Sequence, residues 1–200
     1  MKSIEDFRAG CLTLLGDAAG RRYSSLMLDM GLREALASYG SYCPRKEPVT
    51  VTVARVTGSV AEFDNMLVQG DVLTVRNEAG EWLEHAEYRS GPTLSMTIGA
   101  GSTVPSAGDR LRLEVSVPHR IRGLDDAQQT TVPDVHAVTV MKGAACHALR
   151  MRARSVTEVF GKRPEDRAAL TDQADALELE FCRDMARIAK TQSFSRVPWH

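Results

Sequence analysis

The hydrophobic pattern of this chain changes its period twice, from the repeat of a helix to the alternation of a strand and back again. A repeat of about 3.6 residues places apolar side chains along one side of a helix, whereas alternation places them on one face of a strand. One segment cannot satisfy both patterns. The sequence therefore predicts an α+β protein whose two ends are helical and whose middle is rich in strands.

The N-terminal part predicts two helices. Ser3 and Asp6 are spaced as a capping box in front of the first apolar stripe. The sequence GDAAGRRYSS then interrupts the helical pattern. Ser24 or Ser25 can cap a second helix, which Gly40 is expected to end. The apolar stripe of this second helix consists of Leu28, Leu32, Leu36 and Tyr39.

The central part predicts short antiparallel strands. In the sequence VTVTVARV, residues 49–56, valines occupy one face and threonines the other, as in a strand with one buried face. The glycine-rich sequence GAGSTVPSAGD is interpreted as a hairpin loop and not as a phosphate-binding loop, because a strand follows it. Several strands of this length predict a small sandwich or barrel. The further strands are expected at residues 71–76, 81–89, 93–100 and 110–117.

The C-terminal part returns to helical periodicity. One long helix is predicted with Pro133 near its first turn and Gly161 after its end, and Pro164 opens another. The apolar stripes of these helices need partners, which the two N-terminal helices supply most economically. The shared core is expected to contain Leu32, Leu36, Leu149, Leu177 and Phe181.

The predicted domain organisation follows from the packing of the two N-terminal helices against the two C-terminal helices. Both ends of the chain contribute to one helical bundle, and the β module is an insertion in it. The boundaries are residues 1–45 and 119–191 for the bundle, 46–118 for the antiparallel β module, and 192–200 for an extended C-terminal tail.

The charge balance and the cysteine pattern narrow the class of protein. Lys and Arg number 25 and Asp and Glu number 26, so no overall field would hold the chain on DNA or on an acidic membrane. No apolar stretch approaches the ~18 residues of a transmembrane helix, and the N-terminus lacks the apolar core of a signal peptide. The four cysteines lie far apart and are expected to be free thiols. We therefore expect a soluble protein made in the cytoplasm, without a membrane partner.

The chain offers little catalytic chemistry. Its histidines show no metal-ligand spacing, and no cysteine pair completes a zinc site. His119 with Asp125 and Asp126 is a conceivable acid–base group, although a histidine beside two loop aspartates more often belongs to a solvated loop. We therefore expect no enzyme, no metal and no cofactor.

The segment between the last strand and the third helix, residues 118–133, is unusually long and polar for a connection. Its charges run from basic to acidic in HRIRGLDD. This order suits a contact in which Arg120 and Arg122 of one subunit face Asp125 and Asp126 of another, and a solvated crossover is the alternative.

The C-terminal tail contains aromatic residues without a helical period. Phe194 and Trp199 are side chains of the kind that dominate interface energies, and Arg196 lies between them. We expect these three residues to contact other chains, and a disordered end is the alternative.

Four motifs follow one another in a distinctive order. They are YxxL…REALASY (residues 23–39), PR (44–45), VPHxIxGLDDA…TTVP (117–133) and KGAACHALRxRA (142–153). This order resembles the head–tail adaptor (connector) proteins of tailed bacteriophages and prophages, in the form with a β module inserted in the helical bundle. The likeness covers roughly residues 4–190. Its most specific part is HxIxGLD followed by TTxP and a Gly-Ala-Ala helix, and no residue in it performs chemistry.

The resemblance implies a structural virion protein at the head–tail interface, made in the cytoplasm of the host bacterium. Such proteins form a ring, usually a dodecamer, beneath the portal. The ring extends the DNA channel and provides a docking platform for the stopper or the tail. The implied partners are further copies of the chain, the portal protein, the stopper or tail protein, and double-stranded DNA that passes through the lumen without specific binding.

Two other functions remain open. Another virion structural protein, such as a tail completion or baseplate component, would bind the tail tube and not the portal. An enzyme acting on a small molecule would need a pocket that gathers His119, Asp125 and Asp126 around one point.

Overall fold

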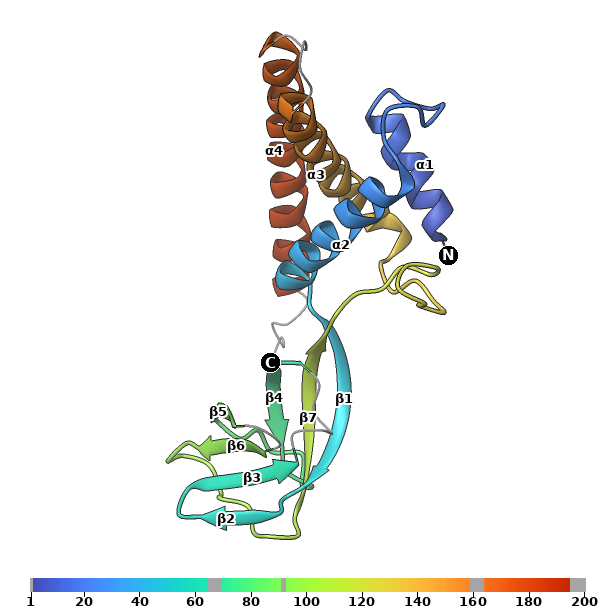
Figure 1. Ribbon diagram of the computed structural model, residues 1–200. Coiled ribbons are helices and arrows are strands. Elements are labelled where there is room, and N and C mark those ends of the chain that lie inside the picture. Colours follow the sequence, from blue (N-terminus) through green and yellow to red (C-terminus); the bar gives the residue numbers. More distant parts are fainter. Residues whose placement is uncertain (1, 65–69, 91–92, 159–163, 195–200) are drawn as a thin grey trace. The chain divides into compact units, whose positions relative to one another are not determined.

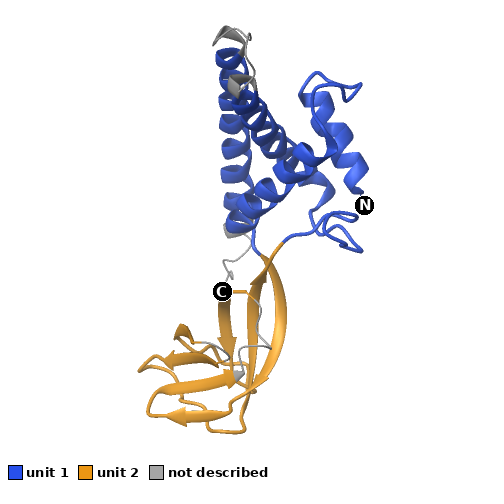
Figure 2. Cartoon of the chain, viewed as in Figure 1, with its two compact units in different colours: residues 1–44, 119–200 blue, residues 45–118 orange. Residues whose placement is uncertain are grey.

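The computed structural model describes residues 2–64, 70–90, 93–158 and 164–194. Over this part of the chain it contains four α-helices and two antiparallel sheets, so the predicted α+β class is confirmed. The chain divides into two compact units, which Figure 2 distinguishes by colour. We call them the helical unit, residues 1–44 and 119–200, and the β unit, residues 45–118.

The helical unit is built from both ends of the sequence (Figure 1). Its first helix follows Ser3, and the side chains of Ser3 and Asp6 form the predicted capping box. The second helix follows Ser24, whose hydroxyl oxygen accepts a hydrogen bond from the Met27 amide at 3.3 Å. The elements are α1 (Ile4–Leu14), α2 (Ser25–Tyr42), the 3₁₀ helix η2 (Asp134–His136), α3 (Ala137–Glu158) and α4 (Pro164–Phe194).

Helix α3 is the central element of the helical unit, because α1, α2 and α4 all pack against it. Small residues let these neighbours approach closely: Gly31 of α2 lies against the backbone of Ala144, and Gly143 lies against the ring of Phe181 from α4. Of the expected core residues, Leu177 is half-buried and packs against the cluster. The others, Leu32, Leu36, Leu149 and Phe181, are buried in it.

Three helix boundaries differ from the prediction. Helix α2 continues past Gly40 to Tyr42, because Pro44 restricts the residue before it to extended conformations and so ends the helix. A 3₁₀ turn after Pro133 precedes α3, closed by a hydrogen bond from the His136 amide to the Pro133 carbonyl. Residues 192–194 belong to α4 and are not an extended tail, because continuing the helix satisfies their backbone groups.

The β unit contains two antiparallel sheets over the described residues. A three-stranded sheet has the order β1-β7-β4, and a four-stranded sheet has the order β2-β3-β6-β5. The alternating apolar residues of both sheets contribute to one hydrophobic cluster, to which Val51, Phe63 and Leu113 belong. The strands are β1 (Arg45–Thr52), β2 (Arg55–Thr57), β3 (Val60–Asp64), β4 (Val72–Arg76), β5 (His85–Ser90), β6 (Thr93–Ile98) and β7 (Arg110–Val117).

The sheet topology corrects part of the prediction. The sequence GAGSTVPSAGD is not a hairpin loop, since it connects β6 of one sheet to β7 of the other. The hairpin of β2 and β3 was not expected, because each strand is too short for its alternation to be distinctive. The strand expected at 81–89 begins only at His85, and before it Trp82 makes a single bridge to Arg76.

Two further expectations concern membrane-spanning helices and the cysteines. Among the described helices, none combines the length and the apolar character needed to cross a membrane. The cysteines are free, as expected: Cys11, Cys43 and Cys146 are buried and Cys182 is exposed. Burial raises the pKa of the Cys11 thiol to about 12, which keeps it protonated and unreactive.

Candidate functional site

The segment of residues 118–133 has the strongest functional signal in the sequence. Its apolar side chains Ile121, Leu124 and Val132 are buried in the core of the helical unit. The segment is therefore folded onto its own chain. Its order comes from contacts within the chain, and the predicted subunit contact of its charged residues stays a prediction.

Hydrogen bonds attach this segment to the start of α1. The Ile4 amide donates to the Arg122 carbonyl at 2.9 Å. The buried hydroxyl of Thr130 accepts from the Arg122 amide at 2.9 Å and donates to the Lys2 carbonyl at 2.6 Å. Thr130 of the TTVP motif, together with the Arg122 backbone, thus joins the N-terminus of the chain to the segment before α3.

The Thr130 hydroxyl provides a test of this attachment. In Thr130→Val the shape is kept, but the Arg122 amide and the Lys2 carbonyl lose their partner. We expect a loss of about 1–2 kcal/mol in the free energy of unfolding, measured by denaturant titration. The exposed Gln129 is the control, because Gln129→Ala should change the stability by less than about 0.5 kcal/mol. Equal stability of Thr130→Val and the parent protein would show that the attachment contributes nothing.

A tight turn at residues 121–127 places the charged residues of the segment. Gly123 has φ +88°, and a Cβ there would lie 2.9 Å from the Cγ2 atom of Ile4, so the turn requires glycine on both grounds. Asp125 and Asp126 also have positive φ, at 51° and 59°. Aspartate tolerates this conformation better than most side chains do.

The structure pairs Asp125 with a partner in the same chain. Arg33 of α2 donates to both carboxylate oxygens of Asp125, with distances of 2.6–3.0 Å. These hydrogen bonds lower the pKa of the Asp125 carboxyl. The predicted contact of Asp125 with an arginine of a neighbouring subunit stays a prediction, in which Arg33 would share the carboxylate. Arg120, Arg122 and Asp126 remain as exposed side chains on an ordered segment.

Two contacts of the His119 ring go to groups other than Asp125. Its Nε2 atom lies 2.8 Å from the Cys43 carbonyl oxygen, and its Nδ1 atom lies 3.2 Å from the Thr131 hydroxyl. Asp125 is engaged by Arg33, so the two groups have different partners. The imidazole also contacts the ring of Tyr39 edge-on, with 4.8 Å between ring centroids.

Two other histidines couple the stability of the helical unit to pH. His136 accepts or donates a 2.6 Å hydrogen bond with the Tyr39 hydroxyl, and His147 lies half-buried on α3. Burial lowers the pKa of both imidazoles below the ordinary value of 6.5. The unfolded chain therefore binds more protons than the folded chain just below pH 6.5.

Acidification is expected to destabilise the protein in this range. The contribution of the neutral histidines is fully present above their ordinary pKa and is lost as the pH falls through the lowered values. We expect the midpoint of thermal unfolding to fall between about pH 7 and about pH 5.5, and to fall less in a His136→Gln, His147→Gln double variant. A parent and a variant with parallel pH profiles would contradict this origin of the pH dependence.

A cavity of about 230 Å³ between α2, α3 and α4 contains groups that could react in other surroundings. Cys146, His147 and Cys182 line it together with Ser38, Tyr42 and Glu178. Burial raises the pKa of Cys146 and lowers that of His147, so thiol and imidazole are both neutral near pH 7. Nucleophilic catalysis needs the opposite, a thiolate beside an imidazolium. Within the described residues, no group of three or more His, Cys, Asp and Glu side chains could hold a metal ion.

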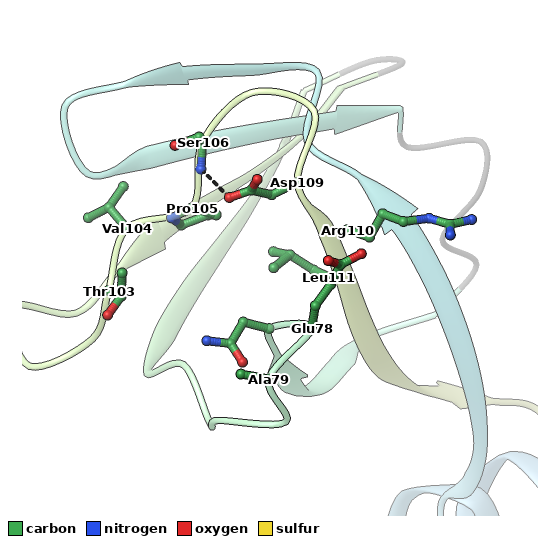
Figure 3. Close-up of a pocket in the computed structure, with 10 residues that line it drawn as sticks. Glu78, Ala79, Thr103, Val104, Pro105, Ser106, Asp109, Arg110 and Leu111 are labelled. Carbon is green, nitrogen blue, oxygen red and sulfur yellow. Dashed lines mark hydrogen bonds between the residues drawn. The ribbon is translucent and has the colours of Figure 1, made fainter.

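The β unit has two shallow cavities that share Glu78 and Arg110. One, of about 400 Å³, is lined by Thr50, Glu78, Arg110 and Arg112. The other, of about 290 Å³, lies between residues 77–79 and 103–109 (Figure 3). In Figure 3, Asp109 turns toward Ser106, whose amide donates to it at 2.7 Å, while Arg110 extends away from Ser106. No motif in the sequence points to Arg110 and Arg112, although the alternation in RLRL places both on one face.

Besides the exposed charges of residues 118–133, the helical unit also has exposed apolar side chains. Leu26 and Met30 are 65% and 47% exposed, and they are one helical turn apart on α2. Val135 of η2 and Val138 at the start of α3 are 84% and 50% exposed. Of the expected tail contacts, Phe194 is the last residue of α4, whereas Arg196 and Trp199 lie outside the described residues.

Comparison with known proteins adds no relative: no protein-family model matches the chain, and the curated proteins give no match.

Proposed function

We propose that this chain is a structural virion protein, a head–tail adaptor that forms a ring beneath the portal. In this function the ring, a dodecamer, extends the DNA channel and offers a docking platform for the stopper or the tail. The proposal begins from the motif order that resembles head–tail adaptors. The segment of residues 118–133, which contains the most specific of these motifs, supplies the structural argument for it.

The observation that carries the proposal is an ordered segment that displays exposed charges. Ile121 and Leu124 are buried and Gly123 makes the turn, so the motif residues fix the backbone. Arg120 and Arg122 lie exposed on this fixed backbone. A surface that is already ordered loses less conformational entropy when it binds, which favours a contact that must be repeated at a constant angle around a ring.

The apolar residues exposed on α2 and α3 fit the same function. A closed ring needs two different faces on each subunit, one complementary to the other. The exposed charges of the segment supply polar groups for one such contact, and Leu26 with Met30 supply apolar area of the kind that the centre of an interface buries. Arginine is well suited to the polar contact, because its guanidinium can make two parallel hydrogen bonds to one carboxylate.

The assembled mass tests the proposal. The full chain is mixed with the portal protein encoded by the same genome, and the products are measured by native mass spectrometry and electron microscopy. A closed ring of this chain bound to the portal is the expected result. A chain that stays monomeric with and without the portal would overturn the proposal, and binding to the tail tube alone would identify another virion component.

Loop variants link the assembly to the proposed contact. Arg120→Glu with Arg122→Glu should leave the free energy of unfolding unchanged, because both side chains are exposed, and should abolish ring formation. Gln129→Glu adds a negative charge to the same segment and is the matched control. Rings formed equally well by the double variant and the control would exclude this segment as the contact.

A further inference from the structure

The outer face of the three-stranded sheet in the β unit carries an uneven distribution of charge. The strand register places Arg112 of β7 directly between Thr50 of β1 and Arg76 of β4. Arg110 lies two residues away on the same face, opposite Thr52. All five side chains are exposed. Three guanidinium groups therefore share one small area of sheet, which we call the arginine face.

The pairing of Arg76 with Arg112 is unfavourable for folding. Two like charges directly opposite each other in an antiparallel pair destabilise the sheet. Among the described residues, no carboxylate forms an ion pair with Arg76, Arg110 or Arg112. A destabilising arrangement that the fold compensates only in part is expected where a ligand supplies the missing charge.

The nearby carboxylates neutralise this face only in part. Glu114 accepts from Lys46 at 3.0 Å and from the Thr74 hydroxyl at 3.3 Å, and these contacts, together with the nearby charge of Arg76, lower the pKa of its carboxyl. Asp109 accepts from the Ser106 amide, and Glu81 accepts from the Asn77 side chain at 2.7 Å. Glu78 is the carboxylate that lines the same cavity as Arg110 and Arg112. The three arginines therefore leave a positive excess.

Trp82 restrains one of the three guanidinium groups. The guanidinium carbon of Arg76 lies 3.8 Å from the centroid of the Trp82 ring, and the ring is 57% exposed. Stacking on an aromatic face holds the guanidinium in a fixed plane while its N–H groups stay available. The arginine face is thus partly organised before any ligand binds.

We propose that the arginine face binds the phosphate groups of a nucleic acid backbone. Guanidinium groups bind phosphate through two parallel hydrogen bonds, and threonine hydroxyls such as those of Thr50 and Thr52 also donate to phosphate oxygens. An acidic protein partner fits less well, because a protein interface normally has an apolar centre, and polar residues occupy the centre of this face. The contact is independent of base sequence, since it involves only backbone groups.

This site goes beyond the proposed head–tail function and does not depend on it. The arginine face belongs to the β unit, whereas the proposed ring contact belongs to the helical unit. Failure of ring assembly and failure of nucleic acid binding would therefore appear in different variants.

Binding of fluorescently labelled DNA to the full chain tests the inference. Single-stranded and double-stranded DNA of one sequence are titrated at several salt concentrations. Arg110→Gln with Arg112→Gln should weaken binding at least about tenfold and reduce the salt dependence by about two counterions. Arg76→Gln should weaken it less. The control is Arg55→Gln, which removes an exposed arginine of the other sheet that is paired with Glu62 at 2.9 Å.

Each outcome decides for or against the site. Preference for either form of DNA supports the phosphate contact and identifies whether a strand or a duplex is held. Thermal unfolding should show the double variant to be at least as stable as the parent, because a like-charge pair is removed. DNA binding that the double variant retains at the parent affinity would overturn the proposal. So would binding of polyglutamate as tight as that of DNA, because it would indicate a site for acidic proteins.

Discussion

Phe181→Ala is expected to lower the free energy of unfolding of the helical unit by about 3 kcal/mol. The ring of Phe181 is 7% exposed and fills the space that the missing side chain of Gly143 leaves between α3 and α4. Alanine would leave that space empty, and neither helix can collapse into it, because their backbones are already held by the rest of the core. Truncations of buried aromatic residues usually cost about 3–5 kcal/mol. We expect the lower end, since Phe181 also borders the open cavity between α2, α3 and α4.

Denaturant unfolding followed by circular dichroism at a helical wavelength measures this loss. Leu179→Ala is the control on the same helix, because Leu179 is 53% exposed and its truncation should change the stability by less than about 0.5 kcal/mol. Leu177→Ala should lie between the two, since Leu177 is only half-buried. Equal losses for Phe181→Ala and Leu179→Ala would mean that α4 does not pack on α3 as described.

The helical unit could be predicted from sequence because its information is local. The capping box of Ser3 and Asp6 and the stripe of Leu28, Leu32 and Leu36 each lie within a few turns of one helix. The segment 118–133 was harder to interpret. Its buried residues Ile121 and Leu124 follow no helical or strand period, so their burial against α1 could not be inferred from spacing.

The candidate sites depended on pairings between distant parts of the chain. Arg33 and Asp125 are 92 positions apart, and nothing near either residue predicts that they meet. The arginine face depends on the pairing of β4 with β7, whose register shifts between Val72 and Thr74. A register different by one residue would place Arg76 and Arg112 on opposite faces. The alternation of β7 places Arg110 and Arg112 on one face, but only the sheet topology brings Arg76 to them.

Two glycines of α2 should respond with opposite signs to the same substitution. Gly31→Ala is expected to destabilise the protein by about 2–3 kcal/mol, because a Cβ there would lie 2.5 Å from the carbonyl oxygen of Ala144. That oxygen belongs to the backbone of α3 and cannot rotate away, so α2 and α3 would have to separate. Gly40→Ala places a Cβ where no atom lies within 4 Å.

The second substitution isolates the intrinsic preference of the helix for alanine. Gly40→Ala should stabilise the protein by about 0.5–1 kcal/mol, because alanine loses less backbone entropy than glycine when the helix forms. The same gain is included in Gly31→Ala, so the difference between the two variants measures the cost of separating α2 from α3. Unfolding curves for both variants and the parent determine that difference. If Gly31→Ala also stabilised the protein, the close approach of α2 to the Ala144 backbone would be excluded.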